Sequence, residues 1–326
     1  MDSINRVLLD RIQRSFPLSA RPYDVLSEGL GIDGEEVRRR LHGLKERNLL
    51  RQISAIFNTG ALGYRSSLVA MSVPEGEVER AGSVVNLYPG VSHNYLRPGN
   101  YNMWFTIAVP PGQSLEKTVE ELAERAGGWP TLILPALKKY KLAVVLDVLE
   151  EGEAGEESSG APVVEALAQF QPTEDNVRVV RCIQEDLPLV DNPFEIWANS
   201  LGITEADLLK LISQWVSYGF IRRFAAVLNH RQVGFSANGM VVWSCPPERL
   251  DGCGKVLSSH AEVSHCYCRP SYPDWPYNLY AMVHARREEE CHSIAEKLGD
   301  AIGLKDYRIL FSTREFKKIR LKLFWS

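Results

Sequence analysis

The feature that most constrains this chain of 326 residues is an internal duplication. Segments of the first half return in the second half at a nearly constant spacing of 171 or 172 residues: Ile12-Gln13 as Ile183-Gln184, Leu30-Gly31-Ile32 as Leu201-Gly202-Ile203, and Ser92-His93 as Ser264-His265. Tyr101-Asn102 returns slightly later, as Tyr277-Asn278, because the second copy has a longer loop over Pro270–Pro276. A register kept at so many positions predicts two copies of one folding unit.

Each copy begins with a helical segment. Leu30-Gly31-Ile32-Asp33 predicts a turn, with Asp33 as the N-cap of a helix over Gly34–Asn48. Helix, helix, tight turn and helix predict a helix-turn-helix. The extended, β-rich segments Leu50–Phe57 and Tyr64–Val73 then predict a wing and the first strand of a sheet.

The remainder of the first copy predicts a ferredoxin-like domain, in the order strand, helix, strand, strand, helix, strand. The elements expected after the first strand are a helix over Glu77–Leu87, strands over Val91–Arg97 and Tyr101–Val109, a helix over Leu115–Ala126 and a strand near Leu142–Val148. Such a sheet carries helices on one face, so its other face must be covered. We therefore expect an internal pseudo-dimer whose two sheets pack face to face.

The predicted fold class is α+β, a tandem duplication of a helix-turn-helix (winged-helix-like) domain and a ferredoxin-like βαββαβ domain. Between the copies, an acidic segment with glycine and serine and no periodicity predicts a solvated linker. The expected boundaries are helix-turn-helix domains over 1–60 and 174–231, ferredoxin-like domains over 61–149 and 232–326, and the linker over 150–173.

Composition limits the function classes. The formal net charge of −4 gives no bulk attraction to nucleic acid or to an anionic membrane. The longest apolar runs are too short to span a bilayer, and the first residues lack a secretory pattern, so we expect a cytoplasmic protein. The six cysteines show no zinc-ribbon or Cys-x-x-Cys pattern, so we expect free thiols, with a metal or redox role for Cys266 and Cys268 as the minor alternative.

A stretch that begins with Ser-His and ends with Arg-Pro occurs once in each copy, at Ser92–Pro98 and Ser264–Pro270. On a strand, alternate side chains share one face, which places a histidine, a tyrosine and an arginine in a row. We name these the histidine rows: His93, Tyr95 and Arg97 in the first copy, and His265, Tyr267 and Arg269 in the second. We hypothesise that the two rows face one another across a cleft.

A helix-turn-helix followed by a ferredoxin-like domain resembles the Lrp/AsnC family of transcriptional regulators, which implies DNA binding. The first expected recognition helix is rich in basic residues, namely Arg38, Arg39, Arg40, His42, Lys45 and Arg47. The second, over Thr204–Tyr218, has one cation, Lys210. A DNA-binding protein with two-fold symmetry needs two similar cationic recognition helices, so we expect DNA not to be the partner. A heme- or metabolite-responsive regulator remains the alternative.

Both copies also look like the paired signatures of the siroheme decarboxylases, Lrp/AsnC-like enzymes of two related subunits that would here be fused. The similar segments are Val91–Phe105, Val263–Pro270, Trp275–His284 and Arg222–His230. The resemblance implies a carboxy-lyase that removes CO2 from two acetate side chains of siroheme. The product would be 12,18-didecarboxysiroheme, for heme d1 or alternative heme biosynthesis.

Siroheme is a flat, polyanionic iron tetrapyrrole, so its site needs apolar walls and several cations. Arginine suits carboxylates because its planar fork pairs with both oxygens. The carboxylate-binding candidates are Arg51, Arg97, Arg222, Arg223 and Arg269. The candidate walls, for which core packing is the default alternative, are Trp104, Phe105, Phe224, Tyr277 and Tyr280. Either His230 or His284 could bind substrate or be an axial ligand of its iron; we expect no cofactor and no metal of the protein's own.

Loss of CO2 from a ring-attached acetate leaves electron density on carbon, which a proton must quench. Histidine can supply that proton near neutral pH, so His93 and His265 are the candidate general acids. Tyr95 and Tyr267 are candidates to orient substrate or histidine, with packing equally open. The divergence of the second copy predicts an asymmetric site. Fusion of both copies in one chain allows the pseudo-dimer to form without self-association, so a monomer and a homodimer both remain open.

Overall fold

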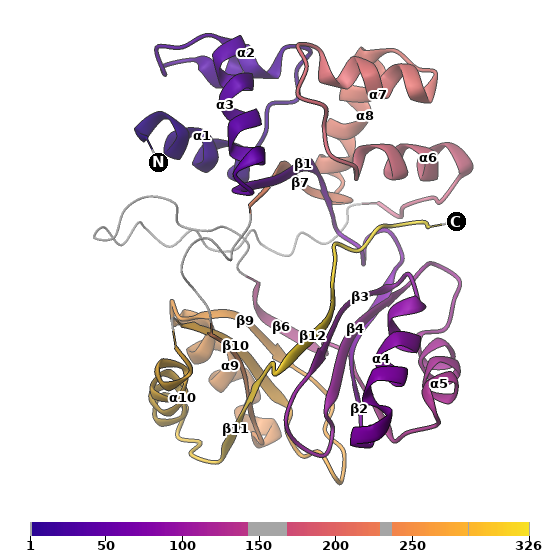
Figure 1. Ribbon diagram of the computed structural model, residues 1–326, viewed down its shortest axis with the longest axis vertical. Coiled ribbons are helices and arrows are strands. Elements are labelled where there is room, and N and C mark those ends of the chain that lie inside the picture. Colours follow the sequence, from indigo (N-terminus) through magenta and orange to yellow (C-terminus); the bar gives the residue numbers. More distant parts are fainter. Residues whose placement is uncertain (1, 143–167, 229–236, 286, 326) are drawn as a thin grey trace. The chain divides into compact units, whose positions relative to one another are not determined.

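The computed structural model describes residues 2–142, 168–228, 237–285 and 287–325 (Figure 1). Its contacts divide the chain into two compact units. The helical unit contains described residues within 2–63, 168–228 and 322–325, and the sheet unit those within 64–142, 237–285 and 287–321. Each unit therefore combines the same segment of both copies.

The helical unit holds the two helix-turn-helix motifs. Their helices are α1 (Ser3–Arg14), α2 (Pro22–Ser27), α3 (Gly34–Glu46), α6 (Glu174–Ile183), α7 (Pro193–Leu201) and α8 (Glu205–Ser217). The predicted N-cap is confirmed, because the Asp33 side chain accepts a hydrogen bond of 2.8 Å from the Glu36 amide. The predicted helix ends early, at Glu46, since Asn48 adopts a left-handed φ of 57°.

The predicted wing is wrong. β1 (Leu50–Phe57) does not fold back within its own copy; it pairs antiparallel with its counterpart β7 (Ile221–Leu228) as a two-stranded sheet. A single strand has unpaired backbone groups at both edges, and the duplicated strand satisfies one of them. The two helical motifs are thus joined by a strand from each.

The sheet unit contains two five-stranded antiparallel sheets, in the orders β12-β3-β4-β2-β5 and β11-β8-β10-β9-β6. The first copy supplies β2 (Arg65–Met71), η1 (Glu75–Glu77), α4 (Val78–Leu87), β3 (Val91–Leu96), β4 (Met103–Val109), α5 (Leu115–Ala126) and β5 (Thr131–Leu134). The second supplies β8 (Ala237–Trp243), η3 (Pro247–Arg249), α9 (Leu250–Ser259), β9 (Val263–Cys268), β10 (Leu279–Ala285), α10 (Glu288–Ile302) and β11 (Tyr307–Phe311). The ferredoxin-like order is confirmed.

The closing strand of the first copy is not where the sequence predicted it. That strand is β5, whereas Leu142–Val148 overlaps only the end of a further strand, β6 (Lys138–Leu142), and residues 143–148 lie outside the described residues. β6 pairs with β9 of the second copy, and β12 (Arg314–Lys318) pairs with β3 of the first. Each copy therefore adds its last strand to the sheet of the other, and β12 lies beside β3 in Figure 1.

An aromatic ring on each exchanged strand packs against a glycine of the helix behind the sheet. A Cβ atom on Gly82 of α4 would lie 3.0 Å from the Phe316 ring, and one on Gly254 of α9 would lie 2.4 Å from the Tyr140 ring. The helix has room for the ring only because these residues lack a side chain. This contact fixes which face of the exchanged strand meets the helix.

The two helix-free faces pack against each other, as predicted. Their shared apolar core draws on both sheets and includes Ala70, Trp104, Leu132 and Leu134 from the first and Met240, Val242, Tyr280 and Leu310 from the second. Trp275, on the longer loop of the second copy, lies 5.3 Å from Trp104 between ring centroids. The chain therefore forms an internal pseudo-dimer through its sheets.

We expect Gly254→Ala to destabilise the protein by about 1–3 kcal/mol, because the added methyl group overlaps Tyr140 and displaces the exchanged strand. Gly252→Ala, in the same helix with nothing within 4 Å of the new Cβ, is the matched control. It should stabilise by up to about 1 kcal/mol through helix propensity. Urea unfolding measures both, and equal effects would contradict the packing described.

Candidate functional site

The histidine rows lie on β3 and β9, on the sheet faces without helices. The alternation is visible at Asn94, which lies between His93 and Tyr95 and donates to Asn86 of α4 on the opposite face (3.1 Å). His93 and Tyr95 have ring centroids 6.1 Å apart, and His265 and Tyr267 6.2 Å. The predicted placement of histidine and tyrosine along one face is thus confirmed in both copies.

A serine contacts each histidine of the rows. Ser92 Oγ lies 2.9 Å from His93 Nδ1, and Ser264 Oγ lies 2.8 Å from His265 Nδ1. A hydrogen bond at Nδ1 restrains the orientation of each imidazole ring. Sequence reasoning omitted these serines from the site, although the repeat of Ser-His in both copies was the available signal.

The second copy extends this contact into a chain of hydrogen bonds. Ser264 Oγ also lies 2.6 Å from His284 Nε2, and His284 Nδ1 lies 2.5 Å from Asn238 Oδ1. An amide oxygen only accepts, so His284 carries its proton on Nδ1 and, when neutral, accepts from Ser264 at Nε2. Ser264 is then left to accept from His265. The first copy has Ala108 opposite Ser66 at the corresponding strand positions, so it lacks this chain.

To act as an axial iron ligand, His284 would have to give up one of its hydrogen bonds, so that role stays a prediction. Both ring nitrogens are engaged, Nε2 by Ser264 and Nδ1 by Asn238, and a ligand needs an available nitrogen lone pair. Direct substrate binding through either nitrogen would break the same contacts. The structure assigns His284 to the hydrogen-bond chain behind His265.

The two row arginines connect the sheets. Arg97 donates to the carbonyl oxygen of Leu310 on β11, and Arg269 donates to that of Leu134 on β5. Their guanidinium carbons lie 5.6 Å from the Tyr95 ring centroid and 4.8 Å from the Tyr267 centroid. Burial lowers the pKa of both arginines, that of Arg97 to about 10.

Neither arginine Nε has a hydrogen-bond partner among the described residues. A buried N–H without a partner is costly, and the described residues show no ion pair of a carboxylate with either guanidinium. Both cations therefore suit an anionic group, while their carbonyl contacts already give them a structural role.

The hypothesis that the two rows face one another needs correction. At its arginine end, each row meets the last ferredoxin strand of the other copy: Arg97 meets β11 and Arg269 meets β5. In their own sheets, β11 is separated from β9 by two strands, and β5 from β3 by two strands. The pseudo-symmetry thus places each histidine row opposite the last ferredoxin strand of the other copy. The reason is the ferredoxin strand order, which separates the row strand from the last strand within each sheet.

The exchanged strands border the rows. Directly paired residues point to the same face of a sheet, so Glu315 and Lys318 of β12 accompany Tyr95 and His93. In the second sheet, Lys139 of β6 accompanies Tyr267. Sequence reasoning missed these three residues, because only pairing between distant parts of the chain places them there.

The candidate walls are core residues. Trp104 is 1% exposed and its indole donates to the Tyr101 carbonyl (2.7 Å), and Tyr277 stacks edge-on to Trp275. Tyr280 shares that core, while Phe105 and Phe224 are buried elsewhere. Both Trp104 and Tyr277 therefore pack in the shared core, and their substrate-binding role stays a prediction.

The remaining cation candidates lie in the helical unit. Arg51 on β1 and Arg222 on β7 are exposed, and Arg223 is half-buried, with a pKa lowered by burial and by Arg222. His230 lies outside the described residues. The histidine rows belong to the sheet unit, so the substrate-binding roles of these four residues stay predictions.

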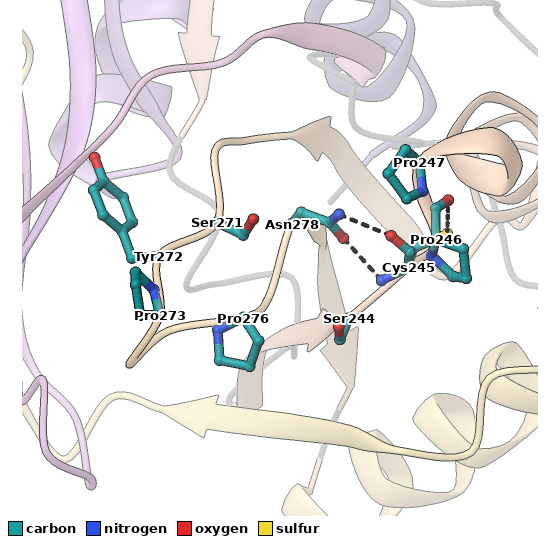
Figure 2. A pocket seen from close by; sticks show the side chains of 9 residues that line it. All are labelled: Ser244, Cys245, Pro246, Pro247, Ser271, Tyr272, Pro273, Pro276 and Asn278. Atoms are coloured by element: carbon teal, nitrogen blue, oxygen red, sulfur yellow. Dashed lines mark hydrogen bonds between the residues drawn. The ribbon is translucent and has the colours of Figure 1, made fainter.

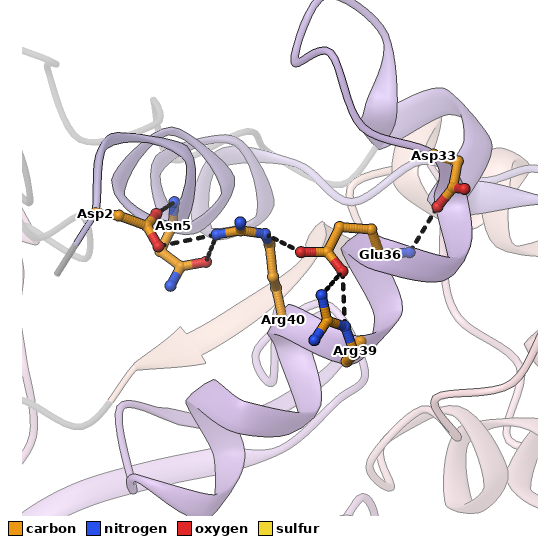
Figure 3. Close-up of polar contacts among 6 residues, drawn as sticks. All are labelled: Asp2, Asn5, Asp33, Glu36, Arg39 and Arg40. Carbon is orange, nitrogen blue, oxygen red and sulfur yellow. Dashed lines mark hydrogen bonds and ion pairs between the residues drawn. The ribbon is translucent and has the colours of Figure 1, made fainter.

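Four of the six basic residues of the first expected recognition helix form ion pairs within the protein, two of them shown in Figure 3. Glu36 binds both Arg39 and Arg40, and Arg40 also contacts Asp2 at 2.9 Å. Two further cations of α3 bind carboxylates of the second motif, Arg38 with Asp191 and Lys45 with Asp186 (2.6 Å). Carboxylates compete with phosphates for these cations, so the basic sequence overstates the charge offered to DNA.

A surface hollow lies beside the longer loop of the second copy (Figure 2), between Ser244–Pro247 and Ser271–Pro276. Asn278 at its wall bridges the Cys245 backbone, accepting from its amide (2.9 Å) and donating to its carbonyl (2.8 Å). Asn102 bridges Val73 in the same way in the first copy. The repeated Tyr-Asn is therefore structural, and none of the predicted site residues lines this hollow.

Three further expectations concern the cysteines, metal binding and membrane-spanning helices. The six cysteines are free, and burial raises the pKa of Cys266 to about 12. Across the ranges given above, no group of three or more His, Cys, Asp or Glu side chains could hold a metal ion. In the same part of the chain, no helix has the length and apolar character needed to cross a membrane.

Comparisons with known proteins match this architecture along the whole chain. The family described as siroheme decarboxylase NirDL-like HTH domain matches residues 5–51 and 176–222, and the AsnC-like ligand binding domain matches 61–141 and 232–317. A siroheme decarboxylase of Hydrogenobacter thermophilus is 38% identical over 97% of this chain and 94% of its own length. The chain belongs to the siroheme decarboxylase family.

Two other members of the family can be compared with the duplication and with the candidate site. The siroheme decarboxylase beta subunit of Methanosarcina barkeri is 41% identical, and the match covers 97% of that subunit but 45% of this chain. The crystal structure of the siroheme decarboxylase NirDL in co-complex with an iron-uroporphyrin III analogue has a TM-score of 0.79 and 33% identity, over 98% of this chain and 94% of that one. One subunit of the family thus corresponds to about half of this chain.

The hydrogen-bond chain predicts an asymmetric response to loss of serine. In 15N NMR spectra of the imidazoles, Ser264→Ala should shift the signals of both His265 and His284, because Ser264 contacts both rings. Ser92→Ala, the matched change in the first copy, should shift His93 alone. Unchanged His284 signals in Ser264→Ala would contradict the chain.

Proposed function

We propose that this protein is a carboxy-lyase that removes CO2 from two acetate side chains of siroheme to give 12,18-didecarboxysiroheme, for heme d1 or alternative heme biosynthesis. The observation that carries the proposal is the histidine row, repeated on the helix-free face of each sheet in a chain of this family. The tetrapyrrole is the proposed partner, its iron arrives with it, and DNA is not a proposed partner.

The proposed step breaks one bond and forms another. The bond between the acetate methylene carbon and its carboxylate breaks, CO2 leaves, and the electron pair stays on the methylene carbon, where the macrocycle delocalises it. A C–H bond then forms with a proton from the imidazolium of His265 or His93, giving a methyl group. Each decarboxylation thus consumes one proton, which the histidine must recover before it acts again.

The contacts behind each histidine fit that cycle. Ser264 holds His265 through Nδ1, so Nε2 is the nitrogen proposed to transfer the proton. His284 follows in the same chain and keeps Ser264 oriented to accept from His265 Nδ1, so the proton given up by His265 is proposed to be recovered at Nε2. Ser92 holds His93 alone, so the first row is the simpler of the two.

The tyrosines and arginines are proposed to bind and position substrate. Tyr95 and Tyr267 lie beside the histidines, where a phenol can donate to a carboxylate. Arg97 and Arg269 keep the tyrosine rings in place by lying over them, and each has an Nε available for an anion. Arg51, Arg222, Arg223 and His230 of the helical unit remain proposed substrate-binding residues.

The regulator alternative has less support. A two-fold DNA reader needs cations free to bind phosphate on both recognition helices. The α3 cations Arg38, Arg39, Arg40 and Lys45 have carboxylate partners, and α8 carries a single lysine, Lys210. The helix-turn-helix segments are proposed to act as scaffold.

Anaerobic incubation with siroheme should give products lighter by one and then two CO2, measured by mass spectrometry. Intact siroheme beside folded protein would contradict the proposed function.

We expect His265→Ala and His93→Ala each to slow decarboxylation by about a hundredfold or more, the usual contribution of a general acid, with siroheme binding largely kept. His292→Ala is the control: this exposed histidine of α10 packs on Phe311, outside both rows. Its turnover should be unchanged. Full turnover by both row variants would remove them as acids.

A further inference from the structure

The two exchanged strands are equivalent in backbone but not in charge. β6 and β12 each pair with a histidine-row strand in the same register and each contain a one-residue irregularity at the aromatic residue, Tyr140 or Phe316. Glu315 therefore occupies, beside Tyr95, the position that Lys139 occupies beside Tyr267. A carboxylate in one copy replaces an ammonium group in the other.

Neighbouring side chains establish which face these two residues share. In β6, Lys138 binds Asp251 of α9 (2.7 Å), and Lys141 donates to the His260 carbonyl at the end of that helix (2.8 Å). In β12, Arg314 binds Glu79 of α4 and Lys317 donates to the Asn86 carbonyl (2.7 Å). These residues all point to the helices, so Lys139 and Glu315, between them on the strands, point to the histidine faces.

The charge of the two faces differs accordingly. On the second sheet, the exposed Lys139 adds a cation beside Tyr267 and near Arg269, which lies over the same ring. On the first sheet, exposed Glu315 adds a negative charge beside Tyr95, and Lys318 beside His93 only offsets it. Because Arg97 and Lys318 outweigh Glu315, the first row also attracts a polyanion, but more weakly than the second row, where Lys139 and Arg269 face no such carboxylate.

We propose that Lys139 binds a carboxylate of the tetrapyrrole at the second histidine row, and that Glu315 at the equivalent position disfavours the first row for the same polyanion. The proposal rests on siroheme being the ligand, as in the proposed function. It makes the second row, with His265, the tighter of the two binding sites for the tetrapyrrole, and the first row, with His93, the weaker one. The exchanged strand of the first copy thus completes the site of the second.

The test is an anaerobic absorbance titration of siroheme with matched variants. Lys139→Gln should raise the dissociation constant by about fivefold, the upper range for a solvent-exposed ion pair, and Lys139→Glu by more than that. The effect of either should shrink as salt rises, because exposed charges are screened. Lys138→Gln is the control on the same strand, since Lys138 faces the helix, and its affinity should match that of the unaltered protein.

Glu315→Gln distinguishes the two rows. It should leave the affinity of the tighter site unchanged within twofold, since that site is at the other row. Equal affinity in Lys139→Glu and the unaltered protein, or weakening in Glu315→Gln comparable to that in Lys139→Glu, would overturn the proposal. Thermal unfolding of each variant verifies that the exchanged strands stay in place.

Failure of this proposal and failure of the proposed function have different signatures. If the Lys139 variants weaken siroheme binding but the mass of siroheme stays unchanged, the site assignment is correct and the proposed decarboxylation is wrong. If CO2 is lost at the normal rate and affinity in Lys139→Glu and Glu315→Gln is unaffected, the activity holds and the site assignment is wrong.

Discussion

The exchange of last strands between the two copies is the constraint on which the sheet unit depends. Without β6 and β12, the strands that carry the histidine rows would be sheet edges with unpaired backbone groups. The exchange closes both edges with residues of the other copy, and the rings of Tyr140 and Phe316 hold the strands against glycines of α9 and α4. It also places charged residues beside the rows that neither copy could supply to itself.

The shared apolar core and the row arginines complete this arrangement. Apolar residues on the helix-free faces bury each other, while Arg97 and Arg269 each donate to a backbone carbonyl of the opposite sheet. Burial of an arginine is costly unless its donors are used, and only part of each guanidinium is used by described residues. The same two side chains therefore join the sheets and are the proposed anion-binding groups.

Duplication has left two histidine rows with one backbone plan and different neighbours. The Ser-His contact is common to both, whereas the extension through His284 to Asn238, the Trp275 loop and the cation Lys139 belong to the second. The first has Ala108 and Glu315 at the corresponding positions. These differences lie on strands in the same sheets as the rows. They therefore change the groups around the histidines without changing the fold.

Local pattern and repetition were sufficient to predict the tandem duplication, the Asp33 cap and the ferredoxin order. They also predicted the alternation that puts His93 and Tyr95 on one face. These follow from spacing along the chain. Only the tertiary structure decided that β1 pairs with β7 instead of forming a wing, that Trp104 and Tyr277 are core, and that His284 backs His265. It likewise decided that Lys139 and Glu315 border the rows, since these contacts join residues more than a hundred positions apart and no local period encodes them.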